Sequence, residues 1–202
     1  MRYYMFNKPK GCITACSDAR HKTVMDYFPE SERDGLFPIG RLDKDTVGLL
    51  IITDDGNLAF NVANPENRVK KTYRFWAKGS CDEEKLQKLR TGVTISTKNG
   101  DITAIGEVKK LADATLRDIA HLLEADSARI LNTRQGDVPV SYVEIAITEG
   151  KKHQVKKMAL AVGLRIVHLE RVSISNVSLD ESLRSGEFRP LSDTEILSLR
   201  NN

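Results

Sequence analysis

The 202-residue sequence is poor in cysteine and in long apolar runs, and each shortage excludes a class of protein. The three cysteines, Cys12, Cys16 and Cys81, are odd in number and form no Cys-x-x-Cys pair, so we expect free thiols rather than a disulfide scaffold. No stretch approaches the ~20 apolar residues of a membrane span, and the start lacks the apolar core of a signal peptide. These absences predict a cytoplasmic protein with no membrane partner.

The familiar motifs of nucleotide, metal and hydrolase sites are also missing. There is no Gly-rich phosphate loop, no dinucleotide fingerprint, no His-Glu-x-x-His and no Gly-x-Ser-x-Gly. Cys12, Cys16 and His21 have no fourth ligand at a spacing suited to zinc. No local sequence motif supports a catalytic triad of His153, Asp43 and a serine. Nothing in the sequence therefore indicates a metal or a nucleotide cofactor.

The composition that remains is that of a globular protein, with 40% hydrophobic and 29% charged residues. The length allows one large domain or two small ones, and no obvious linker divides it, although a small N-terminal lobe over residues 1–64 is possible. The net charge of +3 is unevenly distributed: residues 151–171 carry +5, and residues 68–78 hold five basic residues and no acid. Each basic run fits either a solvated surface or a polyanion-binding face.

Hydrophobic periodicity and turn signals predict a mixture of short strands and helices. Strands are expected at residues 3–6, 49–53, 72–77, 93–95, 102–105, 143–147, 166–169, 172–174 and 177–179, with an Asn99-Gly100 hairpin. Helices are expected at residues 23–28, 58–62, 82–89, 115–131, 151–162 and after Ser192, with Ser80 and Ser192 as capping-box residues. The absence of a regular βαβ alternation favours an α+β fold with a largely antiparallel mixed sheet.

One short motif carries possible chemistry, namely Gly40-Arg41-Leu42-Asp43 just before the apolar run at 49–53. A loop anchored to a buried strand is a suitable place for a reactive group. A carboxylate kept ionised by a nearby cation can act as a nucleophile or base. From spacing alone, an ordinary surface Arg-x-Asp pair is the favoured interpretation.

The string Gly40 to Gly56, GRLDKDTVGLLIITDDG, resembles the catalytic-loop signature of the RsuA family of pseudouridine synthases. Four further segments match that family in the same order. They are Asn7-Lys8-Pro9-Lys10-Gly11, Lys71-Thr72-Tyr73, Glu149 to Met158 (EGKKHQVKKM) and Gly186 to Leu191 (GEFRPL). The resemblance spans nearly the whole chain and implies the pseudouridine synthase catalytic fold over residues 1–202.

By this resemblance, Asp43 is the catalytic aspartate that breaks the uridine N-glycosidic bond and lets the ring rejoin through C5. Tyr73 packs on the target uracil and assists loss of the C5 proton, and Lys156 is the basic residue that the family pairs with the aspartate. Arg41 helps to hold the nucleotide out of its stack. Taken alone, Tyr73 is more typical of a strand core, and Lys156 is more typical of a solvated surface lysine.

The resemblance also implies substrate-binding roles for Lys71, Lys151, Lys152, His153 and Gln154. A flipped uridine loses stacking energy that an aromatic face can partly recover. Because the isomerisation involves no net redox change or group transfer, we expect no cofactor and no metal.

The chain departs from the family in two places. It enters the Asn7-Lys8-Pro9 segment without the N-terminal S4-type RNA-binding domain that many members carry, and residues 106–139 are longer than the usual connection. The expected partner is ribosomal RNA or an assembly intermediate, bound by a monomer. Segments around His153 and residues 12–26 favour small-subunit (16S) RNA. The large-subunit (23S) RNA and a non-catalytic RNA-binding or ribosome-assembly module remain as alternatives.

Overall fold

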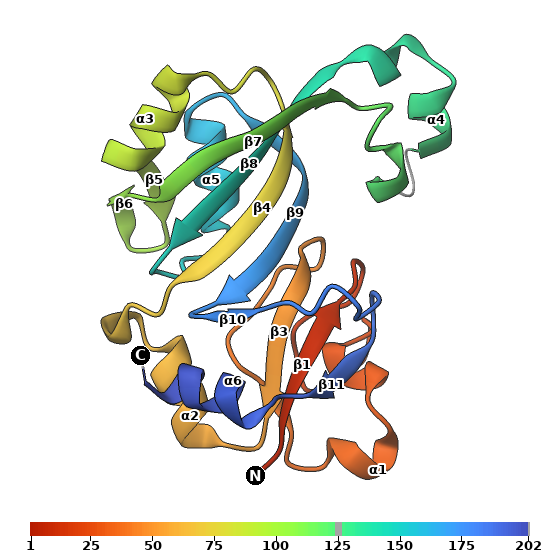
Figure 1. Cartoon of the computed structure of the whole chain (residues 1–202), viewed down its shortest axis with the longest axis vertical. Helices are drawn as coiled ribbons and strands as arrows, with labels where there is room; N and C mark the ends of the chain where they lie inside the picture. The colour runs from red at the N-terminus through yellow and green to blue at the C-terminus, as the bar shows by residue number, and fades with distance from the viewer. Residues whose placement is uncertain (124–126, 202) are drawn as a thin grey trace. The chain divides into compact units, whose positions relative to one another are not determined.

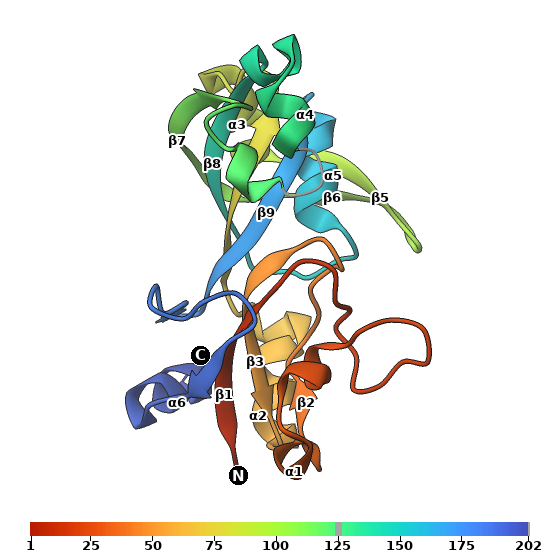
Figure 2. The same cartoon turned by 90° about the vertical axis from the view of Figure 1, so that its right-hand side faces the viewer.

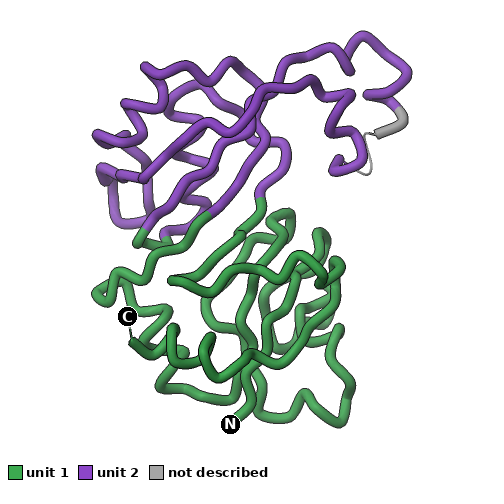
Figure 3. Tube along the Cα trace, viewed as in Figure 1, with its two compact units in different colours: residues 1–72, 148–150, 170–202 green, residues 73–147, 151–169 purple. Residues whose placement is uncertain are grey.

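The computed structural model describes residues 1–123 and 127–201 and divides into two compact units (Figures 1 and 3). The first unit consists of Met1–Thr72, Thr148–Gly150 and Glu170–Asn202, and the second of Tyr73–Ile147 and Lys151–Leu169. Strands β4 (Lys71–Lys78) and β9 (Arg165–Ile174) each have residues in both units. The first unit therefore extends beyond the lobe considered at residues 1–64.

The first unit contains one part of the main mixed sheet. Its strand β1 (Tyr3–Lys8) lies antiparallel to both β3 (Val47–Thr53) and β11 (Phe188–Pro190). The short strands β2 (Phe37–Pro38) and β10 (Val177–Ser178) pair with β3 and β9. Strands β3 and β9 run parallel, with Val47 opposite Glu170 and Gly48 opposite Arg171. The largely antiparallel α+β fold expected from the sequence is confirmed.

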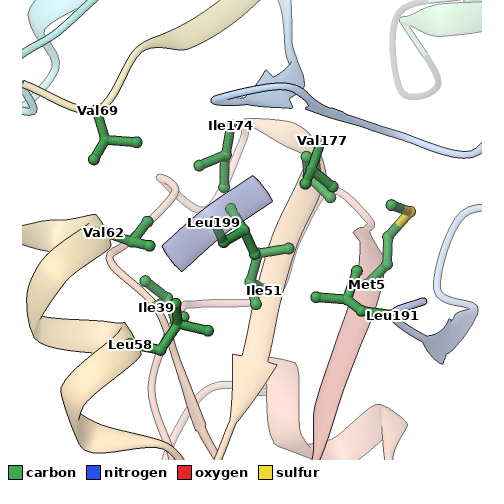
Figure 4. Close-up of a cluster of buried hydrophobic side chains, with 11 residues drawn as sticks. Met5, Ile39, Ile51, Leu58, Val62, Val69, Ile174, Val177, Leu191 and Leu199 are labelled. Atoms are coloured by element: carbon green, nitrogen blue, oxygen red, sulfur yellow. The ribbon is translucent and has the colours of Figure 1, made fainter. Parts of the chain in front are cut away.

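Both faces of this part of the sheet are buried, because β1 and β3 carry apolar side chains at alternate positions on each side. Met5 and Ile51 are register partners and pack against helices α2 (Gly56–Ala63) and α6 (Asp193–Arg200) through Leu58 and Leu199 (Figure 4). On the other face, Phe6 joins a ring cluster with Tyr4, Tyr27, Phe28 and Phe188. The interpretation of residues 49–53 as a strand buried on both faces is confirmed.

The second unit is built on strands in the order β9-β4-β8-β7, with β7 (Glu107–Thr115) antiparallel to β8 (Pro139–Ile147). The strand order of the main mixed sheet is therefore β11-β1-β3-β9-β4-β8-β7. Helices α3 (Glu83–Thr91) and α5 (Gln154–Ala161) pack near β7 and β5. The expected hairpin is present as β5 (Val93–Thr97) and β6 (Gly100–Ala104), and Figure 2 shows it beside α5. Its two-residue turn is Lys98-Asn99, so Gly100 is already in the strand.

The prediction of one amphipathic helix over residues 115–131 is wrong. Strand β7, which the sequence analysis missed, ends at Thr115, and its Thr115 N–H donates to the Asp118 carboxylate at 2.8 Å. A 3-10 turn, η3 (Ala120–Leu122), and a short helix, α4 (Ser127–Leu131), follow; residues 124–126 lie outside the described part. The apolar residues whose spacing resembles that of a helix are buried together with Val140 in a separate small cluster.

Three smaller expectations also change. Helix α5 begins at Gln154 rather than residue 151, because His153 has a left-handed φ of +57°. Residues 166–169 and 172–174 belong to one strand, β9. Asp82, not Ser80, caps α3 by accepting from the Lys85 N–H, whereas Ser192 and Glu195 form the expected capping box of α6.

The remaining elements are short connections. They are the 3-10 turns η1 (Val24–Tyr27), η2 (Pro65–Asn67) and η5 (Arg134–Asp137) and the helix α1 (Glu30–Arg33). None of the helices in residues 1–123 and 127–201 has the length and apolar character needed to cross a membrane. The three cysteines are free thiols as expected, and burial raises the pKa of Cys12 and Cys81.

Candidate active site

The loop that carries Asp43 connects β2 to β3 in the first unit. It begins at Gly40, whose φ of +67° lies in the left-handed region that glycine adopts at little cost. Just before it, the Ile39 N–H donates to the Ile51 carbonyl at 2.8 Å; within it, the Thr46 N–H donates to the Asp43 carbonyl at 3.1 Å. Asp43 is half-buried on this turn, whereas Arg41 is exposed. The carboxylate is therefore accessible on a backbone attached to a buried strand.

Residues 8–14 support the same loop from a second side. The Lys8 side chain is fully buried, and its ammonium donates to the carbonyls of Thr46 at 2.9 Å and Pro9 at 3.0 Å. The Gly11 N–H donates to the Lys44 carbonyl at 2.8 Å. This segment thus fixes backbone positions that follow Asp43 in the chain.

The hydroxyl of Thr14 fixes the backbone that precedes Asp43. It donates to the Leu42 carbonyl at 2.7 Å and accepts from the Leu42 N–H at 3.1 Å, with both residues buried. The sequence analysis quoted Lys8 within a motif but gave it no role, and it missed Thr14. Lys8 could have been found as the one charged residue on the alternating face of Tyr4 and Phe6. Thr14 has no comparable signal.

Lys71 is placed by the end of helix α2 in the first unit. Its ammonium donates to the Val69 carbonyl at 2.9 Å and to the Val62 carbonyl at 3.4 Å. Burial, and then the positive charge of Arg171, lower the pKa of Lys71 from 10.5 to about 8. These contacts account for the position of the side chain within the protein, and the substrate-binding role expected for it stays a prediction.

Tyr73 lies in the second unit on β4 and is 9% exposed. The alternation of the strand places it on the same face as Phe75 and Ala77, which are fully buried. On the opposite face, the Arg74 guanidinium donates to the Glu144 carboxylate at 2.8 Å. Tyr73 therefore stands at the edge of a buried face with a small accessible area, a position compatible both with core packing and with stacking on a base.

The basic segment before α5 also belongs to the second unit. Lys151, Lys152 and His153 are exposed, and Lys156 is half-buried in the first turn of the helix. Gln154 is only 3% exposed, and its side-chain oxygen accepts from the Lys151 N–H at 3.0 Å. Gln154 thus orders the turn that presents the three exposed basic side chains.

The predicted site residues are distributed over both units. Arg41, Asp43 and Lys71 belong to the first unit, and Tyr73, Lys156 and residues 151–154 belong to the second. The first unit contains the supported carboxylate and two of the predicted cations, and the second contains Tyr73 and the remaining predicted basic residues. Within residues 1–123 and 127–201, no group of three or more His, Cys, Asp or Glu side chains could hold a metal ion.

Comparison with known proteins shows the family to which the chain belongs. Residues 2–161 match the family described as RNA pseudouridylate synthase. The chain belongs to that family. It is therefore an RNA pseudouridine synthase, an isomerase.

Individual relatives agree with this assignment. The chain is 39% identical to RNA pseudouridine synthase YtzG of Bacillus subtilis, over 96% of this chain and 71% of the relative. It is 34% identical to ribosomal small subunit pseudouridine synthase A of Salmonella typhimurium, over 98% of this chain and 74% of the relative. The family identified from the GRLD loop and its four companion segments is thereby confirmed.

Solved structures resemble the fold as well. A pseudouridylate synthase crystal structure matches with a TM-score of 0.77 and 31% identity, covering 98% of this chain and 73% of that one. The human RNA Pseudouridylate Synthase Domain Containing 1 matches with a TM-score of 0.61 at 15% identity, covering 100% of this chain and 93% of that one. The second likeness shows the fold alone.

Proposed function

We propose that this RNA pseudouridine synthase isomerises one uridine of ribosomal RNA, and that the RNA is that of the small subunit. The observation that supports this most strongly is the 34% identity, over 98% of this chain, to a protein named ribosomal small subunit pseudouridine synthase A. Proteins of the same name in Yersinia pestis and Escherichia coli are 32% and 30% identical over the same share of the chain. A cytoplasmic location is part of this proposal.

Asp43 is the catalytic residue in this proposal. Its carboxylate acts on the ribose of the flipped uridine while the N1–C1′ bond breaks. The free ring then turns, the C5–C1′ bond forms, the C5 proton leaves and N1 gains a proton, so that atoms and charge balance. The half-buried position of Asp43 on a loop supported by Lys8, Gly11 and Thr14 suits such a step, since a nucleophile needs a fixed geometry.

Tyr73 and Lys156 have supporting roles. The Tyr73 ring stacks on the uracil and assists removal of the C5 proton, for which its small exposed area at the edge of a buried face is suited. Lys156 is the basic residue that the family places beside its aspartate. Its half-buried position in the first turn of α5 restricts the freedom of its side chain.

RNA binding in this proposal rests on exposed cations. Lys151, Lys152 and His153 bind phosphate groups, because they are exposed and their backbone is ordered by Gln154. Arg41 is exposed two residues before Asp43 and helps to hold the target nucleotide out of its stack. Lys71 contributes positive charge near the start of β4.

In vitro modification of defined RNA tests the proposal. The protein is incubated with unmodified transcripts of 16S and 23S ribosomal RNA and with small-subunit assembly intermediates, and pseudouridine is mapped at each uridine. One new pseudouridine in 16S RNA supports the proposal, and the Asp43→Asn variant serves as the matched control because amide and carboxylate are nearly isosteric.

Three other results would replace the proposal. Modification of 23S RNA alone would assign the enzyme to the large subunit. Tight binding of ribosomal RNA with no product on either RNA or on the intermediates would favour a non-catalytic binding or assembly module. In a parallel reaction with unmodified transfer RNA, modification of that RNA alone would exclude a ribosomal substrate.

A further inference from the structure

The Thr14 hydroxyl makes two hydrogen bonds to one residue, Leu42. The Oγ1 atom donates to the Leu42 carbonyl at 2.7 Å and accepts from the Leu42 N–H at 3.1 Å. Thr14 is 7% exposed and Leu42 is 6% exposed, so water does not readily replace either bond. The Thr14 side chain thus satisfies both the N–H and the carbonyl of Leu42, as a neighbouring strand would in a sheet.

The bonded carbonyl belongs to the peptide unit that joins Leu42 to Asp43. Because that peptide is planar, fixing its oxygen also fixes the orientation of the Asp43 N–H and the direction in which the Asp43 Cα leaves the peptide. Within this loop, Lys8 and Gly11 donate to carbonyls after Asp43, those of Thr46 and Lys44. Thr14 instead fixes the backbone just before Asp43, on its N-terminal side.

The backbone around Thr14 is itself anchored. Ile13 accepts from the Val24 N–H at 3.0 Å and donates to the Lys22 carbonyl at 2.9 Å, and Ile13 and Thr23 form a β-bridge. The hydroxyl therefore extends from a segment connected to residues 22–24, and it does not move freely with the loop that it contacts.

We infer that Thr14 is a positioning residue for catalysis, which keeps the Asp43 carboxylate in its reactive geometry through the Leu42 peptide. The inference rests on the proposed catalytic role of Asp43. A misplacement of about 1 Å can lower a catalytic rate by roughly 100-fold without loss of binding. Removal of the hydroxyl should therefore lower kcat much more than it changes RNA affinity.

The chain offers a matched control in Thr53, which is buried in the same unit at the far end of β3. Its hydroxyl also makes one donated and one accepted bond to the backbone, to the Arg2 carbonyl at 2.6 Å and from the Asp55 N–H at 3.0 Å. Thr→Val leaves one N–H and one carbonyl without a partner at either position. The two variants should lose comparable stability, but only one of them affects the Asp43 loop.

The test compares Thr14→Val, Thr14→Ser and Thr53→Val. Each variant is assayed by thermal unfolding, by binding to 16S ribosomal RNA transcript, and by single-turnover and steady-state formation of pseudouridine on the RNA that the wild type modifies. We expect Thr14→Val to lower kcat by about 10- to 100-fold with KM and RNA affinity nearly unchanged. Thr14→Ser, which retains the hydroxyl, should restore most of kcat, and Thr53→Val should keep it.

The outcomes separate this inference from the proposed function. The inference would be overturned if Thr14→Val kept the wild-type kcat, or if Thr14→Val and Thr53→Val lost kcat equally. In either case, an inactive Asp43→Asn variant would leave the role of Asp43 intact. If Thr14→Val fails to fold, Thr14→Ala in the same assays and the degree of rescue by Thr14→Ser decide instead. An active Asp43→Asn variant would overturn the role of Asp43, and this inference with it.

Discussion

A β-carbon added to Gly48 would lie 2.4 Å from the carbonyl oxygen of Arg171, which is far inside van der Waals contact. The two residues are register partners where β3 and β9 run parallel, and Gly48 has a φ of +97°. The Arg171 guanidinium also donates through Nε to the Leu49 carbonyl at 2.8 Å. The glycine that closes the GRLDKDTVG motif is therefore required by backbone packing beside the Asp43 loop.

Gly48→Ala should destabilise the protein by about 2 kcal/mol or more, because a left-handed backbone costs about 1–2 kcal/mol for a residue with a β-carbon and overpacking adds to it. Chemical denaturation measures the change. Gly56→Ala is the control, since nothing lies within 4 Å of a β-carbon there and its φ is not left-handed. Equal stability of the two variants would show that β3 and β9 approach less closely than described.

The ionisation of Lys71 should make stability depend on pH in the alkaline range. Its pKa in the folded protein, about 8, lies below the ordinary 10.5, mainly because of burial and then because of Arg171. The unfolded chain therefore binds more protons between these values, and the free energy of unfolding contributed by Lys71 rises as the pH rises from about 8 to 10.5.

Lys71→Met should remove this rise, whereas Lys10→Met, at an exposed position, should retain it. Urea denaturation at several pH values between 7 and 10.5 measures the difference in unfolding free energy between each variant and the wild type. A Lys71→Met difference that stays constant with pH would show that Lys71 has no depressed pKa in the folded protein.

The exposed lysines before α5 should control the salt dependence of RNA binding. Lys151→Ala and Lys152→Ala should each weaken binding and reduce the slope of log affinity against log salt by roughly one counterion. The control is Lys88→Ala, because the Lys88 ammonium is paired with Glu84 at 2.7 Å. An unchanged slope in both variants at positions 151 and 152 would remove these residues from the RNA-binding surface.

The sequence predicted most accurately those elements whose residue pattern is typical of a single kind of structure. Residues 49–53 form a continuous apolar run, and the structure buries them in β3 on both faces. Ser192 and Glu195 have capping-box spacing and form that box. The GRLD loop and its companion segments predicted the family, which the comparisons confirm.

What the sequence did not reveal depends on contacts between distant residues. Residues 115–131 have helical spacing, but Thr115 ends β7 opposite Pro139, and the apolar side chains that follow form a cluster with Val140. Thr14 and Leu42 are 28 positions apart, and no local pattern joins them. In residues 115–131, tertiary packing overrides the local periodicity. For Thr14, only the fold shows that its side chain supports the Asp43 loop.

The central claim is that Asp43 is the catalytic residue for pseudouridine formation in small-subunit ribosomal RNA. The most direct measurement maps pseudouridine in the ribosomal RNA of cells that lack this protein and are supplied with either the wild type or Asp43→Asn at equal levels. One 16S pseudouridine should be lost without the protein, should return with the wild type and should not return with Asp43→Asn. Return of that pseudouridine with Asp43→Asn, or loss of no site in 16S RNA, would contradict it.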